Sequence, residues 1–175
     1  MHDLEVEMPE IPEDHRFEQF FFDAPTTRRL SAEAMRHRRP LLLCLPSIAE
    51  VLDAAGHPYI LLDRDSRFRH LPGWRRWDLQ KPELVFEDFD ALLCDPPFAN
   101  VTLAELVRAV DLLAAGAPSA PSVHLAYIDT REAALLEAFA HHGLTRRFGP
   151  LGYRTVKAET QARIAWYGPR GDATG

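Results

Sequence analysis

The chain has 175 residues, of which 46% are hydrophobic and 26% charged, and its formal net charge is −6. This composition suits one globular domain, and the negative charge argues against an obligate nucleic-acid-binding protein, which is usually basic. No apolar run is long enough to span a membrane, and the acidic N-terminus lacks the features of a signal peptide. We therefore expect a cytoplasmic protein that does not bind membranes.

Composition also predicts where the folded part begins and ends. Residues 1–16 are acidic, contain two prolines and have no periodicity, so they are expected to form a flexible tail. The domain is predicted over residues 17–168, followed by a flexible C-terminus at 169–175. Cys44 and Cys94 lie in apolar runs and are expected to be buried core residues.

Hydrophobic spacing gives the elements in chain order. A helix from Thr26 or Thr27 to His37, capped by one of these threonines, is followed by Pro40 and a buried strand at 41–45. The next elements are a helix at 48–55, a strand at 59–62, a polar loop at 66–82, a strand at 89–94, a helix at 103–115, a strand at 123–128, a helix at 130–142, and two closing strands around 146–148 and 162–167.

This alternation predicts an α/β fold, with a mostly parallel sheet covered by helices on both faces. Ligands in such folds bind at the carboxyl ends of the strands. The polar residues predicted at those ends are Ser47, Asp63, Asp65, Asp95 and Asp129.

The most informative of these segments is Asp95-Pro96-Pro97-Phe98. The prolines fix the backbone and remove two N–H donors, so the Pro96 carbonyl and the Asp95 carboxylate can accept the two hydrogens of one amino group. Phe98 offers an aromatic face, which suits a planar amine such as N6 of adenine. Methyl transfer to that nitrogen would depend on positioning and electrostatics. The alternative is a turn that the prolines merely stiffen.

The chain resembles the N6-adenine methyltransferase-like family, whose members methylate adenine in ribosomal RNA or a lysine of a translation elongation factor. The segments that carry this resemblance, in order, are Gln19-Phe20-Phe21-Phe22, residues 61–68 (Leu-Leu-Asp-Arg-Asp-Ser-Arg-Phe) and Asp95-Pro96-Pro97-Phe98, with a less specific match at 161–167. The resemblance implies a single Rossmann-like class I methyltransferase domain and S-adenosylmethionine as cofactor.

By this resemblance, the N-terminal phenylalanines and the acid of the second strand line the cofactor pocket, and Asp95 to Phe98 hold the target amine. The expected cofactor-binding residues are Phe20, Phe21, Phe22, Pro46, Ser47, Asp63 and Asp65. A carboxylate at the position of Asp63 can accept hydrogen bonds from both ribose hydroxyls. The alternatives are core packing for the phenylalanines, a turn for Asp63 and a local ion pair between Asp65 and Arg67.

The loop after the first strand departs from the usual methyltransferase pattern. It reads Leu45-Pro46-Ser47-Ile48, without the glycines that let the backbone approach a cofactor, although the resembling family also tends to lack glycine there. A non-catalytic binding module that keeps the fold is therefore an alternative. An NAD enzyme is not favoured, because no Gly-x-Gly-x-x-Gly is present.

Substrate contacts are expected from Phe98, Asn100 and the Trp74-Arg75-Arg76 segment, in which aromatic and cationic residues alternate as in single-strand-binding proteins. The alternative for this segment is a tryptophan packed on the sheet beside solvated arginines. His141 and His142 are explained by a helix C-terminus, and no spacing predicts a metal site.

The first functional hypothesis is methylation of the N6 amine of adenine in nucleic acid, expected to be RNA. The second is methylation of a protein lysine, which the acidic charge favours. We expect no appended targeting domain, and therefore targeting by the domain's own surface or by a partner.

Overall fold

The computed structural model describes residues 11–17, 19–97 and 99–171, and strands in this part of the chain form one sheet in the order β3-β2-β1-β4-β5-β7-β6. β1 to β5 are parallel, and β7 is antiparallel to both of its neighbours. The predicted mostly parallel α/β fold is confirmed. The strands are β1 (Pro40–Leu43), β2 (Ile60–Asp63), β3 (Trp74–Arg76), β4 (Ala91–Cys94), β5 (Ser122–Ile128), β6 (Leu144–Phe148) and β7 (Ile164–Pro169).

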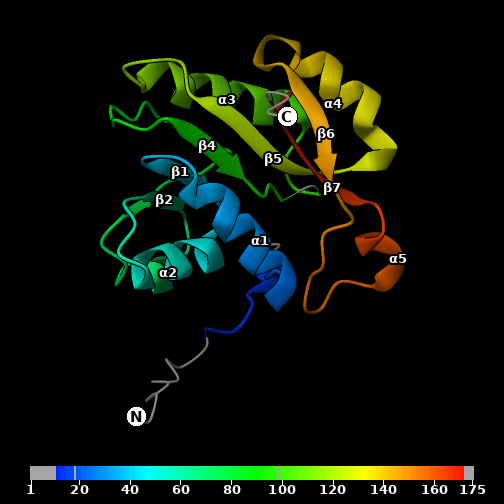
Figure 1. Cartoon of the computed structure of the whole chain (residues 1–175), viewed down its shortest axis with the longest axis horizontal. Helices are drawn as coiled ribbons and strands as arrows, with labels where there is room; N and C mark the ends of the chain where they lie inside the picture. Colours follow the sequence, from blue (N-terminus) through cyan, green and yellow to red (C-terminus); the bar gives the residue numbers. More distant parts are fainter. Residues whose placement is uncertain (1–10, 18, 98, 172–175) are drawn as a thin grey trace.

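Helices cover both faces of the sheet, with α1 and α2 on one side and α3 and α4 on the other (Figure 1). Their bounds are α1 (Ala24–Met35), α2 (Pro46–Ala54), α3 (Leu103–Gly116), α4 (Glu132–Ala138) and the short α5 (Ala158–Gln161). The 3-10 turns are η1 (His15–Phe17), η2 (Ser66–Phe68), η3 (Asp129–Arg131) and η4 (Ala140–His142). Among the described residues, no helix is long and apolar enough to cross a membrane.

Every residue of β1, β2 and β4 is buried, as expected for strands covered on both faces. Alternate side chains of β1 point to opposite faces, so that Leu41 and Leu43 join the cluster beneath α3 and α4, while Leu42 joins the cluster beneath α1 and α2. The sheet thus separates two apolar cores. Because side chains pack closely on both of its faces, its central strands have little freedom to move.

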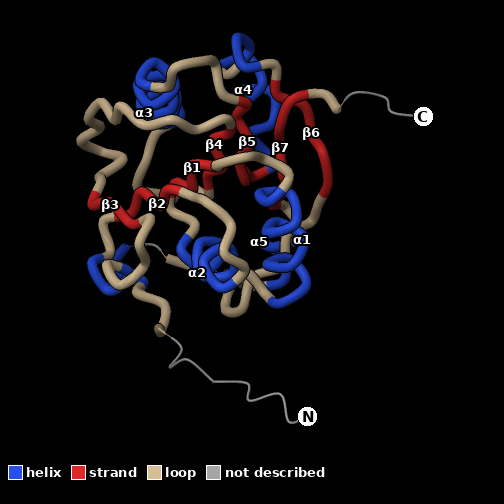
Figure 2. The backbone as a smooth tube through the Cα atoms, turned by 60° about the vertical axis from the view of Figure 1, so that its left-hand side comes forward, coloured by secondary structure: helices blue, strands red, loops and turns tan. Residues whose placement is uncertain are grey.

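The chain changes direction across the sheet at β1. It runs from β1 outward through β2 to β3 at one edge, and then crosses back to β4 on the other side of β1 (Figure 2). Such a reversal leaves a crevice at the carboxyl ends of the central strands. The connections that follow β1, β2 and β4 meet there.

Three predicted elements need correction. The cap of α1 is Asp23, whose carboxylate accepts the Thr26 N–H, rather than Thr26 or Thr27. The loop at 66–82 contains η2 and the edge strand β3, which the pattern missed because the segment is short and polar. The helix predicted at 130–142 is divided into η3, α4 and η4, and Gly143 at φ 64° ends it.

Part of the sequence assigned above to the acidic tail contacts the domain. The Glu13 carboxylate accepts hydrogen bonds from the Phe21 N–H and the Thr155 hydroxyl, and the Pro12 carbonyl accepts one from Arg67. Residues 11–16 thus lie beside the crevice, whereas residues 1–10 are outside the described part of the chain.

The cap of α1 generates a test of the fold. Replacing Asp23 by alanine leaves the Thr26 N–H without its acceptor, and we expect the free energy of unfolding in urea to fall by about 1 kcal/mol. Asp23→Asn retains an acceptor and should lose less. Thr27→Ala should change stability by less than about 0.5 kcal/mol; an equal loss in both alanine variants would contradict the assignment of the cap.

Candidate functional site

A cavity of about 320 Å³ opens at the carboxyl ends of β1, β2 and β4. It brings together many of the residues that the sequence singled out. Those that line it are Phe20, Phe21, Phe22, Pro46, Ser47, Asp63, Asp95, Pro97 and Asn100. They come from four separate parts of the chain, which the sheet topology makes neighbours.

Asp63, the last residue of β2, is a buried acid in the cavity wall. Burial raises the pKa of its carboxyl to about 6, and the hydrogen bond from the Asp65 N–H only partly offsets this. At neutral pH the group is therefore a mostly ionised acceptor that is buried in the cavity wall. Such an acceptor favours a ligand that brings hydroxyl donors to it.

Asp65 does not line the cavity. Its carboxylate accepts hydrogen bonds from the Arg67 guanidinium and the Gln19 amide, and it caps η2. Burial raises the pKa of this carboxyl, but the bonds from Arg67 and Gln19 outweigh burial and lower it below its ordinary value. The geometry matches the local ion pair that was the alternative for Asp65.

Asp95 follows β4 directly, and its backbone N–H donates to the Leu43 carbonyl of β1. The Tyr153 hydroxyl donates to its carboxylate at 3.1 Å. Tyr153 is itself buried, and burial with the nearby Asp95 charge raises its phenol pKa well above the ordinary value. The phenol therefore stays a proton donor and fixes one Asp95 oxygen at the cavity.

The phenylalanine run, residues 20–22, contacts several of the segments that form the cavity. Phe22 pairs with Tyr153 in an isolated antiparallel bridge, and their ring centroids lie 4.7 Å apart. Phe21 packs edge-on against Phe68 at 6.4 Å, and Phe20 stacks on His15 at 5.0 Å. Phe21 and Phe22 are buried, whereas Phe20 is partly exposed. The run therefore builds the cavity wall and also positions Tyr153.

Cys44 has a backbone conformation that glycine adopts more easily than other residues. It adopts φ 57°, a left-handed conformation that costs a non-glycine residue about 1–2 kcal/mol, and it turns the chain from β1 into α2 along the cavity wall. Cys44 follows β1 and is only partly buried, although it packs against the core beneath α3 and α4, so the expected full burial holds for Cys94 but not for Cys44. Strain of this kind concentrates at ligand sites.

The segment Trp74-Arg75-Arg76 lies in β3, outside the cavity lining. Trp74 packs against the core beneath α1 and α2, and Arg75 pairs with Glu87 at 3.7 Å. This arrangement matches the alternative given above, in which the tryptophan packs on the sheet. Pro96 is buried between the cavity-lining residues Asp95 and Pro97, and Phe98, the last residue of the Asp95-Pro96-Pro97-Phe98 segment, lies outside the described residues.

Ten further residues of the wall were not predicted: Arg16, Gln19, Cys44, Leu45, Arg64, Trp77, Asp78, Leu79, Gln80 and Val101. Several belong to the connection between β3 and β4, which folds over the cavity and is tied to the Asp95 loop by a hydrogen bond from the Gln80 amide to the Asn100 carbonyl. Adjacency to Asp63 could have indicated Arg64. Nothing local indicates Trp77 or Tyr153.

A known protein family matches the part of the chain that contains most of these residues. The model of a family described as "Probable N6-adenine methyltransferase" matches residues 13–145, more than half of the chain. The match begins before the phenylalanine run and ends after α4, so it includes Asp63 and Asp95. Curated proteins gave no match.

Solved structures with a similar fold include methyltransferases. A magnesium protoporphyrin IX methyltransferase from Synechocystis with bound SAM is 16% identical, with a TM-score of 0.58 over 83% of this chain and 79% of that one. The N-methyltransferase NodS from Bradyrhizobium japonicum, in complex with S-adenosyl-L-homocysteine, is 13% identical, with a TM-score of 0.55 over 85% and 90%. A branched-chain polyamine synthase from Thermus thermophilus is 16% identical, with a TM-score of 0.63 over 89% and 58%. At these identities the likeness shows the fold.

The raised pKa of Asp63 predicts a cost of folding that depends on pH. Between its ordinary value of 3.8 and about 6 the folded state holds a proton that the unfolded state has lost, so stability contributed by this group falls as the pH rises through that window. Asp63→Asn removes the buried charge. We expect it to stabilise the ligand-free protein by about 1–3 kcal/mol at pH 8, with a gain that shrinks toward pH 4.

The measurement is urea unfolding of both proteins across this pH range. Asp88→Asn removes an exposed carboxylate paired with Arg38 and serves as the control, with an expected change of under about 1 kcal/mol. A loss of stability in Asp63→Asn at pH 8 would show that the charge is compensated in the folded protein.

Proposed function

The chain belongs to the probable N6-adenine methyltransferase family and is a methyltransferase; from this premise we propose that it transfers the methyl group of S-adenosylmethionine to the N6 amine of adenine in RNA. The observation that carries the proposal is the meeting of Asp63 and Asp95 in one cavity. In this proposal Asp63 binds the ribose of the cofactor and Asp95 binds the target amine.

The cavity fits S-adenosylmethionine on three features. The buried Asp63 carboxylate accepts a hydrogen bond from the Asp65 N–H at 2.8 Å, and is a suitable acceptor for ribose hydroxyls. Phe20 and Phe21 supply aromatic surface for an adenine ring. α2 begins at the cavity with Pro46 and Ser47 and has no side-chain cap, so its N-terminal N–H groups suit the carboxylate of the methionine part.

The methyl group, carried on a sulfonium, is electrophilic when the cofactor is bound. The protein's task is therefore to orient the acceptor nitrogen. The Asp95 carboxylate, held by Tyr153, and the carbonyl of its neighbour Pro96 would accept the two amine hydrogens. The nitrogen lone pair would then be free to face the methyl group that the cofactor supplies. The amine loses its extra proton after transfer, so no strong base is needed.

The family description favours adenine, and two arginines at the cavity wall suit the phosphates beside a flipped-out base. They are Arg64 and Arg16, of which Arg16 also pairs with Asp14 at 2.7 Å. The second candidate is a protein lysine. The net charge of −6 favours it, because a cationic side chain would be attracted to this surface. The glycine-free loop no longer supports a non-catalytic module, since Cys44 makes the turn that glycine usually makes.

Replacing Asp95 by asparagine tests the proposal. The change keeps the size and one oxygen acceptor but removes the charge that orients the amine. We expect kcat for methyl transfer to RNA to fall by about 10²–10³-fold, while the Kd for S-adenosylhomocysteine changes less than about 3-fold. The measurement uses radiolabelled S-adenosylmethionine with adenine-containing RNA, with DNA and with lysine peptides.

Asp88→Asn, an exposed acid remote from the cavity, is the matched control and should retain full activity. Transfer to RNA should weaken steeply between 50 and 200 mM salt, because phosphate contacts release counterions (about 10-fold or more for a few contacts). Labelling of peptide but not RNA would replace adenine by lysine as substrate. Full turnover by Asp95→Asn would remove Asp95 from the mechanism.

A further inference from the structure

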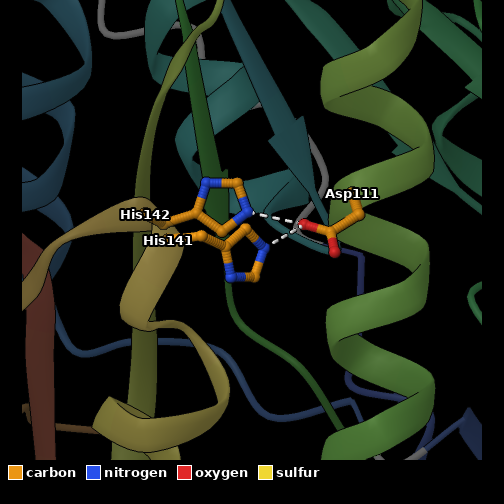
Figure 3. A group of neighbouring side chains, drawn as sticks. All are labelled: Asp111, His141 and His142. Carbon is orange, nitrogen blue, oxygen red and sulfur yellow. Dashed lines mark hydrogen bonds and ion pairs between the residues drawn. The ribbon is translucent and has the colours of Figure 1, made fainter.

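A second cluster of chemically active side chains lies apart from the cavity. Asp111 projects from the middle of α3, and His141 and His142 come from η4, the turn that follows α4. Figure 3 shows all three side chains pointing toward one another. None of them lines the cavity that contains Asp63 and Asp95, so the proposed reaction leaves this cluster unexplained.

The geometry of the cluster is convergent. The Nε2 atoms of His141 and His142 each lie 2.7 Å from the same oxygen, Oδ1 of Asp111. The three ligand atoms are within 4.8 Å of one another. One carboxylate oxygen and two imidazole nitrogens thus face a common point.

Two imidazole nitrogens and one carboxylate oxygen are a ligand set that zinc prefers. We propose that Asp111, His141 and His142 bind a zinc ion, with water as the fourth ligand. Zinc bonds of about 2.0–2.2 Å in a tetrahedron place ligand atoms roughly 3.3 Å apart. The two 2.7 Å contacts would therefore lengthen by roughly half an ångström, and each imidazole would carry its proton on Nδ1.

The side chains have room for this adjustment. The Asp111 side chain is 44% exposed and that of His141 is 51% exposed. The His142 side chain is only 13% exposed and is held in place by packing beside Phe139. A water ligand can reach the open side of the cluster. The ion would link α3 to the turn that leads into β6, so it would stabilise the folded chain by binding only that state.

The test uses zinc alone, added to untagged full-length protein and followed by calorimetry and by thermal unfolding. We expect one zinc per chain and a rise in Tm of about 5 °C or more at saturating metal. Asp111→Ala and His141→Ala each remove one ligand and should weaken zinc binding by at least about 10-fold. His70→Ala, which deletes an exposed histidine elsewhere, should bind zinc as the unmodified protein does.

Binding of S-adenosylhomocysteine should be unchanged in Asp111→Ala and His141→Ala, so the zinc site can fail while the proposed function stands. If His142→Ala fails to fold, zinc binding by the variants at the two exposed positions, Asp111 and His141, still tests the proposal. Absence of stoichiometric zinc binding would overturn the proposal. So would zinc binding of equal strength in both alanine variants and the unmodified chain.

Discussion

The site depends on the way in which β1 holds its two neighbours in register at their carboxyl ends. The Leu43 carbonyl accepts the Asp95 N–H, and the Cys44 N–H donates to the Leu62 carbonyl. These two hydrogen bonds place the residues after β1 and β4 beside the end of β2. Because all three strands are buried on both faces, the arrangement is rigid, and Asp63 and Asp95 are positioned before any ligand arrives.

A contact outside the sheet also holds the site together. The bridge between Phe22 and Tyr153 joins the segment before α1 to the connection between β6 and β7, and the Tyr153 hydroxyl reaches Asp95. Packing and chemistry are therefore coupled: the aromatic contact that buries Phe22 also orients the carboxylate. The match to the family includes Phe22 and Asp95 but ends before Tyr153, so one partner in each of these contacts comes from beyond the matched segment.

The sequence located Asp63 and Asp95 because a polar residue at the end of a buried parallel strand lies at the carboxyl edge of the sheet, where ligands bind. It could not locate Tyr153, which lies 58 residues from Asp95 in the chain and meets it only through tertiary closure. β3 was missed because a short polar edge strand has no hydrophobic pattern. The role of Cys44 depends on its backbone angle, which residue type alone does not reveal, and the same limit hid the meeting of Asp111 with the two histidines.

If the cavity at Asp63 binds the methyl donor, calorimetric titration with S-adenosylhomocysteine should find one site with micromolar affinity, about −8 kcal/mol. Asp63→Ala should bind at least about 10-fold more weakly, since a buried acceptor for the ribose is lost, and Asp88→Asn should bind normally. No binding to the folded protein, or equal binding by Asp63→Ala, would show that this cavity is not the cofactor site.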